Sequence, residues 1–127
     1  MKKFMLFLIV IFTFFGVTHT GKPEVPPQKR VWTIHDSKAY ARDIMLRYND
    51  AQFQCLEKLW TKESNWRSNA YNKVKVMGKN AGGIPQLLGL SPHVPATRQI
   101  DRGFAYIIYR YGSPCKALKF HERKGWY

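Results

Sequence analysis

An uncharged apolar run near the N-terminus constrains this chain most, because it limits how much of the chain is left to form a folded domain. Residues 4–17 are 14 consecutive residues without a charge, preceded by two lysines. A membrane-spanning helix needs about 20 apolar residues, whereas the apolar centre of a secretory signal is this short. We therefore expect residues 1–20 to be a signal peptide that directs the chain to the cell envelope or out of the cell. A retained N-terminal anchor is the alternative, because residues 18–20 make only a tolerable cleavage site.

A polar segment separates the apolar run from the part that we expect to fold. Residues 21–32 hold three prolines and several charges, which is typical of an extended linker. Residues 33–127 then make one domain, because a stretch of this length has room for a single hydrophobic core. Aromatic residues make up 15% of the chain, which is too many for a disordered polar tail.

Apolar residues at helical spacing predict a mainly α domain. The expected helices start at a cap formed by residues 36–37, cover residues 51 to about 66 and residues 99–111, and start again at residues 113–114. Residues 67–97 lack a helical period and hold four glycines and three prolines. They are expected to be a long central loop, with room for a little irregular sheet.

The chain has two cysteines, Cys55 and Cys115, which stand 60 positions apart. A small exported domain often carries a disulfide, and a bond across this interval would stabilise the fold by about 4 kcal/mol in the loop-entropy model. Two unpaired buried thiols are the alternative. A catalytic thiol is not favoured, because no base accompanies either cysteine in the local sequence.

The strong positive charge bears on the choice of partner. The chain has 21 Lys+Arg against 8 Asp+Glu, a formal net charge of +13, and loss of residues 1–20 would leave +11. Such a domain is attracted to anionic polymers, which in a cell envelope include teichoic acids and the acidic peptides of peptidoglycan. Binding to nucleic acid is not favoured, because no helix-turn-helix, zinc finger or aromatic single-strand platform is recognisable. Membrane contact is expected only through the signal or anchor segment.

One carboxylate stands at an unusual place in the helical pattern. Glu63 shares a face with Leu59 and Trp60, near the C-terminal end of its expected helix. Burial there, together with the negative end of the helix dipole, would raise the pKa of the carboxyl group, as a general acid near neutral pH requires. The alternative is that Glu63 reaches solvent at the edge of the apolar stripe. No metal or cofactor is expected, because His35, His93 and His121 lack nearby ligand partners.

Four blocks of sequence resemble soluble lytic transglycosylases, in particular the small secreted type. The blocks are residues 55–66 (CLEKLWTKESNW), 81–86 (AGGIPQ, against Ala-Tyr-Gly-Ile-Pro-Gln), 99–115, and 125–127 (GWY). They stand in the order that the family has. The match departs from the family at Gly82, where Tyr is usual, and at residues 118–121, which do not supply the Ala-Tyr-Asn block of the larger enzymes.

The resemblance implies a lysozyme-like α fold with a cleft for glycan strands and assigns roles to individual residues. Glu63 would be the catalytic acid/base, and the pairing of Cys55 with Cys115 fits relatives that have both cysteines. The residues implied to orient the acid or to contact substrate are Ser64, Gly83, Ile84, Gln86 and Tyr106. Two of these have simpler alternatives, since Ser64 could cap the helix end and Tyr106 could be an ordinary core tyrosine.

The activity implied by the resemblance is cleavage of the bond between N-acetylmuramic acid and N-acetylglucosamine in peptidoglycan. A single glutamate would serve as acid and then as base, giving 1,6-anhydromuramoyl products, and the chain would act as a monomer without a cofactor. Two alternatives stay open at this point. Water attack would make the protein a hydrolytic muramidase, and a fold without turnover would be a cell-wall-binding or assembly module.

Overall fold

The structure is a computed structural model of the 127-residue chain, and it describes residues 16, 20–24, 26 and 30–127. The chain divides into two units, Met1–Arg30 and Val31–Tyr127. The predicted signal peptide lies almost entirely outside the described residues, so the structure does not bear on it. Within the described part of the chain, no helix has the length and apolar character that a membrane span requires.

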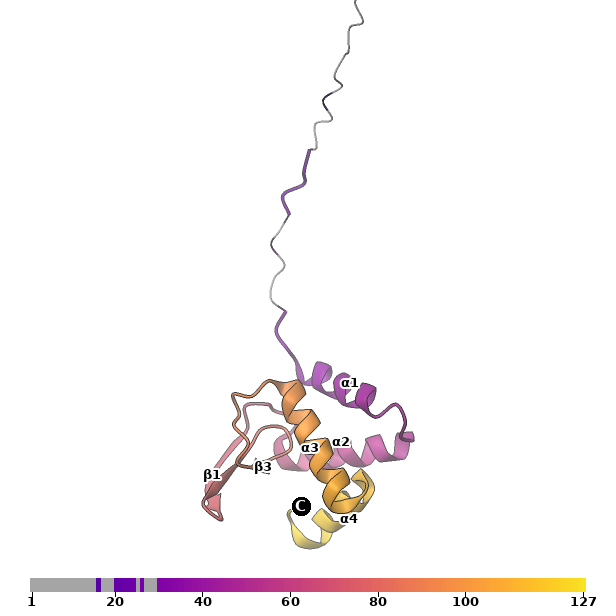
Figure 1. The fold of residues 1–127 in the computed structure, drawn as a ribbon, viewed down its shortest axis with the longest axis vertical. Coiled ribbons are helices and arrows are strands. Elements are labelled where there is room, and N and C mark those ends of the chain that lie inside the picture. The colour runs from indigo at the N-terminus through magenta and orange to yellow at the C-terminus, as the bar shows by residue number, and fades with distance from the viewer. Residues whose placement is uncertain (1–15, 17–19, 25, 27–29) are drawn as a thin grey trace, which may run out of the picture. The chain divides into compact units, whose positions relative to one another are not determined.

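Residues Val31–Tyr127 form helices and a small antiparallel sheet (Figure 1). In chain order the elements are α1 (Ile34–Ile44), α2 (Asp50–Ser64), β1 (Tyr71–Val76), β2 (Lys79–Gly82), β3 (Leu87–Leu88), α3 (Ala96–Tyr111) and α4 (Pro114–Lys124). Helices supply most of the regular structure, as predicted. The segment predicted to be mainly loop, residues 67–97, holds a three-stranded sheet.

The first helix begins earlier than the sequence suggested. Thr33 is the N-cap of α1, because its hydroxyl accepts from the backbone N–H of Asp36 while the Asp36 carboxylate accepts from the Thr33 backbone. The expected cap at residues 36–37 was therefore wrong. Asp36 is the acidic member of a capping box, and Ser37 is buried, where its hydroxyl accepts from the indole N–H of Trp32 at 2.9 Å.

The other helix ends follow the predicted signals more closely. Asn49 caps α2, and Ser113 with Pro114 starts α4. Helix α2 ends at Ser64, not near Trp66, because Asn65 takes the left-handed conformation (φ 53°). Helix α3 starts at Ala96, three residues before the predicted start, and ends at Gly112 as expected.

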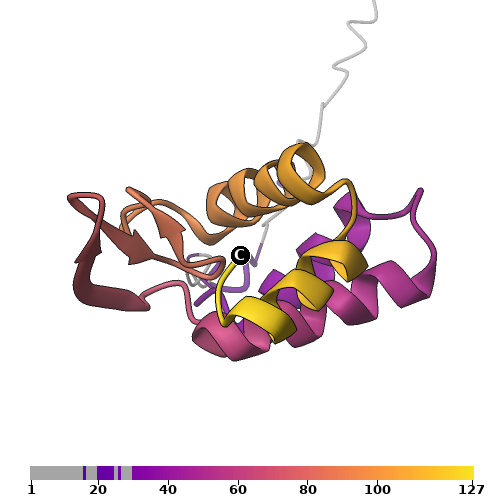
Figure 2. The same ribbon diagram turned by 90° about the horizontal axis from the view of Figure 1, so that it is seen from below.

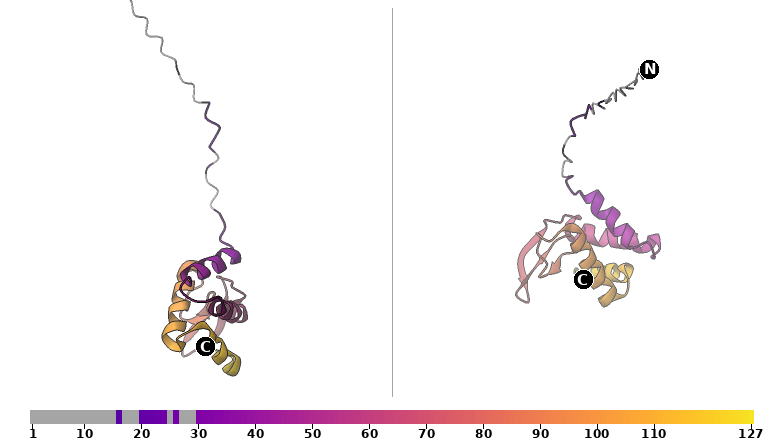
Figure 3. Two further views of the ribbon diagram at one scale, coloured as in Figure 1. Left: turned by 90° about the vertical axis from the view of Figure 1, so that its right-hand side faces the viewer. Right: turned by 45° about the horizontal axis from the view of Figure 1, so that its top comes forward.

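Helices α1–α4 enclose the core, and the sheet lies to one side of them (Figures 1–3). Helix α2 packs along α4, while α1 packs against α3. Figure 2 shows α2 and α4 side by side, with the end of the chain at Tyr127 lying between α4 and the sheet. The largest side chains with no exposed surface include Trp60, Leu56, Leu59, Ile100 and Ile107.

The sheet is a projecting hairpin with a short third strand. Its order is β1-β2-β3, with Tyr71 opposite Gly82 and Lys75 opposite Asn80. The register shifts between these pairs, and the Asn80 side-chain amide donates to two backbone carbonyls of β1 at 2.9 and 3.1 Å. All six residues of β1 are exposed, so the hairpin is held by backbone pairing and not by a core of its own.

A disulfide joins α2 to α4. Cys55 and Cys115 are bonded, with their Cα atoms 4.9 Å apart, which confirms the predicted pair and leaves no free cysteine in the described part of the chain. The contact is reinforced by the side chain of Gln52, which accepts from the backbone N–H of Cys115 at 3.0 Å. The disulfide therefore fixes how the first half of α2 meets the start of α4.

Replacing both cysteines by serine should lower the free energy of unfolding by about 4 kcal/mol, because the unfolded chain regains the entropy of a long open loop. Urea denaturation of the oxidised protein and of the double variant measures this difference. Reducing agent should destabilise the parent protein and leave the double variant unchanged. Equal unfolding midpoints for parent and variant would contradict the prediction.

Candidate active site

Glu63 lies in the last turn of α2, on the helix face that packs toward the domain interior. Its side chain is 16% exposed, and its neighbours Leu59 and Trp60 are fully buried. Burial raises the pKa of the Glu63 carboxyl group to about 7. The carboxyl group therefore does not stand in bulk solvent.

The closest polar partner of Glu63 is His121, a residue to which the sequence gave no role. Nε2 of His121, on α4, lies 2.8 Å from Oε1 of Glu63, and the imidazole side chain is 14% exposed. Burial, with a smaller contribution from the charge of Lys62, lowers the pKa of His121. In the sequence, His121 is marked only by its place in residues 118–121, the segment that does not match the Ala-Tyr-Asn block of the larger enzymes.

The second oxygen of Glu63 is open. Among the described residues Oε2 makes no hydrogen bond, and it is not one of the buried polar atoms that lack a partner. Oε2 is therefore the carboxyl oxygen that a bound molecule can reach. The arrangement allows Glu63 to give a proton to a neighbouring oxygen and to take one back.

Tyr127, near the Glu63 carboxyl group, joins α2 to the loop at residues 81–86 by two hydrogen bonds. The hydroxyl of Tyr127 accepts from the indole N–H of Trp60 at 3.0 Å and donates to the backbone carbonyl of Pro85 at 2.6 Å. Burial first, and then the nearby charge of Glu63, raises the pKa of Tyr127 well above its usual value. Gly103 permits this packing, since a Cβ there would lie 2.6 Å from Cβ of Pro85.

The loop at residues 81–86 is tied to α2 and α3 by two buried polar side chains. The Ser64 hydroxyl donates to the backbone carbonyl of Ile84 at 2.6 Å, and the Gln99 side-chain carbonyl accepts from the Ile84 backbone N–H at 2.8 Å. Gln99 also donates to the backbone carbonyls of Ser68 and Val94, at 2.9 and 2.8 Å. A fully buried glutamine thus organises the whole loop.

Three residues with roles predicted from the sequence have partners inside the protein. The Ser64 hydroxyl bonds to Ile84 and makes no direct hydrogen bond to the Glu63 carboxyl group in the described structure. Ile84 is fully buried, and its backbone N–H and carbonyl bond to the side chains of Gln99 and Ser64. Gly83 is buried at φ 72°, and its lack of a Cβ makes room for the amide of Gln99.

Gln86 and Tyr106 keep accessible polar groups. The Gln86 amide donates to the backbone carbonyl of Gly83 at 2.9 Å, and its side chain is half-buried. The Tyr106 hydroxyl accepts from Arg110 at 2.7 Å, and its ring meets that of Tyr127 edge-on at 5.8 Å. No direct hydrogen bond joins Tyr106 to Glu63 among the described residues, and the ring of Tyr127 contacts that of Tyr106.

Other described acids are engaged elsewhere. Asp50 pairs with Arg42 at 3.1 Å, Glu57 lies 3.8 Å from Lys38, and Asp101 accepts from the hydroxyl of Tyr40 at 2.9 Å. Over the described ranges, no group of three His, Cys, Asp or Glu side chains could hold a metal ion.

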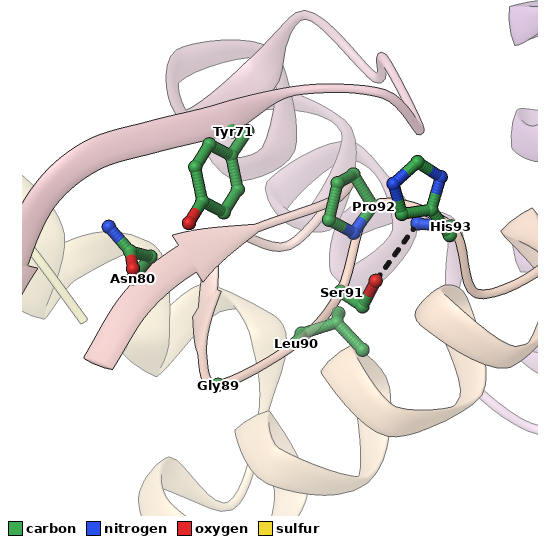
Figure 4. Close-up of a pocket in the computed structure, with 7 residues that line it drawn as sticks. All are labelled: Tyr71, Asn80, Gly89, Leu90, Ser91, Pro92 and His93. Atoms are coloured by element: carbon green, nitrogen blue, oxygen red, sulfur yellow. Dashed lines mark hydrogen bonds between the residues drawn. The ribbon is translucent and has the colours of Figure 1, made fainter.

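Two surface hollows stand apart from Glu63. One, of about 530 Å³, lies under the hairpin, where Tyr71 and Asn80 face the segment from Gly89 to His93 (Figure 4). The other, of about 510 Å³, is an apolar depression between α1 and α3 that includes Ile44 and Phe104. Neither is lined by Glu63. The first adjoins the loop at residues 81–86, because Gly82 packs directly against the backbone of Leu90.

Comparison with known proteins gave no relative. No protein-family model matches the chain, no curated protein matches it, and no solved structure matches it. The assignment of a function therefore depends on the site itself and on the four sequence blocks.

Replacing Glu63 by Gln should stabilise the fold at alkaline pH and leave its stability unchanged at pH 4. The parent carboxyl group ionises near pH 4.5 when unfolded and near pH 7 when folded, so the parent loses stability as the pH rises between these values. The full difference above pH 7 is at most about 3 kcal/mol. Thermal unfolding from pH 4 to pH 9 measures it. Glu57→Gln, at a more exposed position on the same helix, is the control, and a constant difference at all pH values would contradict the prediction.

Proposed function

We propose that this protein is a peptidoglycan lytic transglycosylase with a lysozyme-like fold, in which Glu63 is the single acid/base. The observation that carries the proposal is a largely buried carboxyl group with a pKa near 7 and one oxygen open to a ligand. The four sequence blocks support it, because the buried acid is the residue at which the first block aligns with the family's catalytic glutamate.

The reaction needs one group that holds a proton and then accepts one. Protonated Glu63 would give its proton to the oxygen between N-acetylmuramic acid and N-acetylglucosamine as the C1–O bond breaks. The N-acetyl group of the substrate would stabilise the positive charge that develops at C1. Glu63, now a carboxylate, would take the proton of the 6-hydroxyl as O6 bonds to C1. The product is a 1,6-anhydro ring, the acid is restored, and no water is consumed.

Among the described residues no other acid makes a polar contact with Glu63, and this favours the route. Ordinary glycosidases use two carboxyl groups about 5–10 Å apart, one of them as nucleophile or base. The nearest polar partner of Glu63 is a neutral imidazole, and three other acids of the described part of the chain are bound to side chains of their own. An intramolecular hydroxyl nucleophile removes the need for the second carboxylate.

The hairpin is the proposed contact with anionic wall polymers. Lys73, Lys75 and Lys79 are exposed on β1 and β2, and no described acid pairs with any of them. The hollow of Figure 4 lies at the base of the same hairpin and is lined in part by Tyr71, an aromatic ring of the kind on which sugars stack. Positive charge beside a glycan-sized hollow suits a polymer that carries both sugars and acidic groups.

Replacing Glu63 by Gln should reduce the release of soluble muropeptides from purified sacculi by at least about 100-fold, because the variant cannot donate a proton. Mass spectrometry of the digest measures the products of the parent protein. Anhydro-ended muropeptides are expected. The variant should still sediment with sacculi, which separates loss of chemistry from loss of binding.

Two outcomes of that digest would replace the proposal. Products with reducing ends would make the protein a hydrolytic muramidase, since water would then have attacked C1. No soluble product from the parent protein, with binding to sacculi retained, would make it a cell-wall-binding or assembly module. The variant Glu57→Gln serves as the matched control, because it removes an acid from the same helix outside the site.

Replacing the three hairpin lysines by glutamine should weaken binding to sacculi about 10-fold at low salt and have little effect at 0.5 M NaCl, because salt screens the attraction. Co-sedimentation at several salt concentrations measures this change. The control is the replacement of Lys38, Lys58 and Lys116, three lysines on the helices, by glutamine. An equal loss for both triple variants would show that net charge, and not the hairpin, determines binding.

A further inference from the structure

One nitrogen of the His121 imidazole lies within hydrogen-bonding distance of an oxygen of Glu63, and the other nitrogen has no partner. Nε2 lies 2.8 Å from Oε1 of Glu63, while Nδ1 is a buried atom with no hydrogen-bond partner. Both side chains are about 15% exposed, so solvent does not readily replace the missing partner. Nε2 has a neighbouring acceptor and Nδ1 has none, and this difference determines which nitrogen carries the proton.

The empty surroundings of Nδ1 favour the tautomer that carries its proton on Nε2. A buried N–H group without an acceptor is rarer and costlier than an acceptor without a donor. With the proton on Nε2, only a lone pair is left without a partner at Nδ1. An imidazolium ion would place a proton on both nitrogens and would strand one of them. His121 is thus expected to be neutral, with Nε2–H as a donor toward Glu63.

The charged and titratable groups around His121 agree with a neutral ring. From α2, the charge of Lys62 disfavours a second positive charge; from α4, the charge of Glu122 favours one but has the smaller effect, and burial of the ring has the largest. From the end of the chain, Tyr127 lies with its ring 6.5 Å from the imidazole and stays protonated. None of these groups is a hydrogen-bond acceptor for Nε2 in place of Oε1.

An N–H group that donates to Oε1 determines which oxygen of the protonated Glu63 carboxyl group carries the proton. Oε1 uses a lone pair to accept the N–H of His121, so the proton of the carboxylic acid is placed on Oε2. Oε2 is the oxygen without a protein partner. The acid proton then points to the side from which a substrate would approach.

We propose that His121 is a positioning residue whose neutral imidazole donates Nε2–H to Oε1 of Glu63 and so places the acid's proton on Oε2. Its catalytic consequence rests on the proposed function, whereas the tautomer does not. The test therefore has one arm that needs no activity and one that does.

The first arm is ¹⁵N NMR of histidine-labelled protein between pH 6 and pH 8. We expect His121 to show a protonated Nε2 and a bare Nδ1 throughout this range. A proton on Nδ1 alone, or an imidazolium ion at pH 7, would overturn the proposal. This result is independent of whether the protein cleaves any glycan.

The second arm compares His121→Leu with His121→Gln, because glutamine can place an N–H donor near the position of Nε2. The leucine variant should have a kcat about 10- to 100-fold lower, with binding to sacculi unchanged. Its activity should also persist to higher pH by about one pH unit, since loss of a donor to the carboxylate raises the pKa of Glu63. The glutamine variant should stay within a few-fold of the parent, and His35→Leu, on the exposed side of α1, should match the parent.

An unshifted pH profile in the leucine variant, or a glutamine variant as impaired as the leucine variant, would overturn the positioning role. If the parent protein releases no muropeptides, the proposed function is wrong. The pKa of Glu63, measured by ¹³C NMR in the parent and in both variants, then decides the role of His121 by itself.

Discussion

The pairing of α2 with α4 is the constraint on which the site depends. The Cys55–Cys115 disulfide joins the two helices near their starts, and the Glu63–His121 contact joins them near their ends. From one contact to the next α2 advances eight residues and α4 advances six, so the helices run in the same direction over about 10 Å. Once the disulfide sets their register, an imidazole at position 121 faces the carboxyl group at position 63. The disulfide and the Glu63–His121 contact therefore lie at two ends of the interface between α2 and α4, the helices that Figure 2 shows side by side.

The loop at residues 81–86 depends on a second set of contacts that start from the same helix. Ser64 follows Glu63 directly and holds the carbonyl of Ile84, while Gln99 holds the N–H of Ile84 from α3. Tyr127 then fastens the carbonyl of Pro85 and reaches the indole of Trp60 on α2. The loop residues that resemble a substrate motif in the sequence are largely held by hydrogen bonds to α2, α3 and Tyr127. These bonds fix the position of the loop relative to Glu63.

The sequence predicted the parts of the fold that follow from local chemistry. The start of the last helix at residues 113–114, the end of α3 at residue 111 and the buried acid at position 63 all depend on residues within one or two turns of each other. The helix start at Thr33 was missed because Asp36 resembles a cap in the sequence, whereas it is the acidic member of a capping box that Thr33 begins. The hairpin was expected to be loop because its strands lack a buried face and so carry no alternating pattern.

The partners of the site residues could not be predicted, since each contact joins positions far apart in the chain. His121 meets Glu63 across 58 positions, Gln99 meets Ile84 across 15, and Tyr127 meets Pro85 across 42. Helical periodicity places a side chain on a face but does not say which polar atom it will meet. The contacts of Ser64, Ile84 and Gly83 inside the protein were not predicted for this reason. Ser64 was expected to orient the Glu63 carboxylate, and Ile84 and Gly83 were expected to lie near a substrate.

The raised pKa of Glu63 in so basic a molecule indicates which electrostatic effect is larger at this site. A net charge of +13 favours the carboxylate form of every acid, and Lys62 stands next to Glu63 in the chain. Exposed charges, however, are screened over about 8–10 Å at physiological ionic strength, whereas loss of hydration acts on the carboxyl group itself. The pKa of Glu63 is raised, so burial outweighs the surrounding positive charge. The proposed attraction of the basic surface for an anionic polymer is therefore compatible with a raised pKa of Glu63.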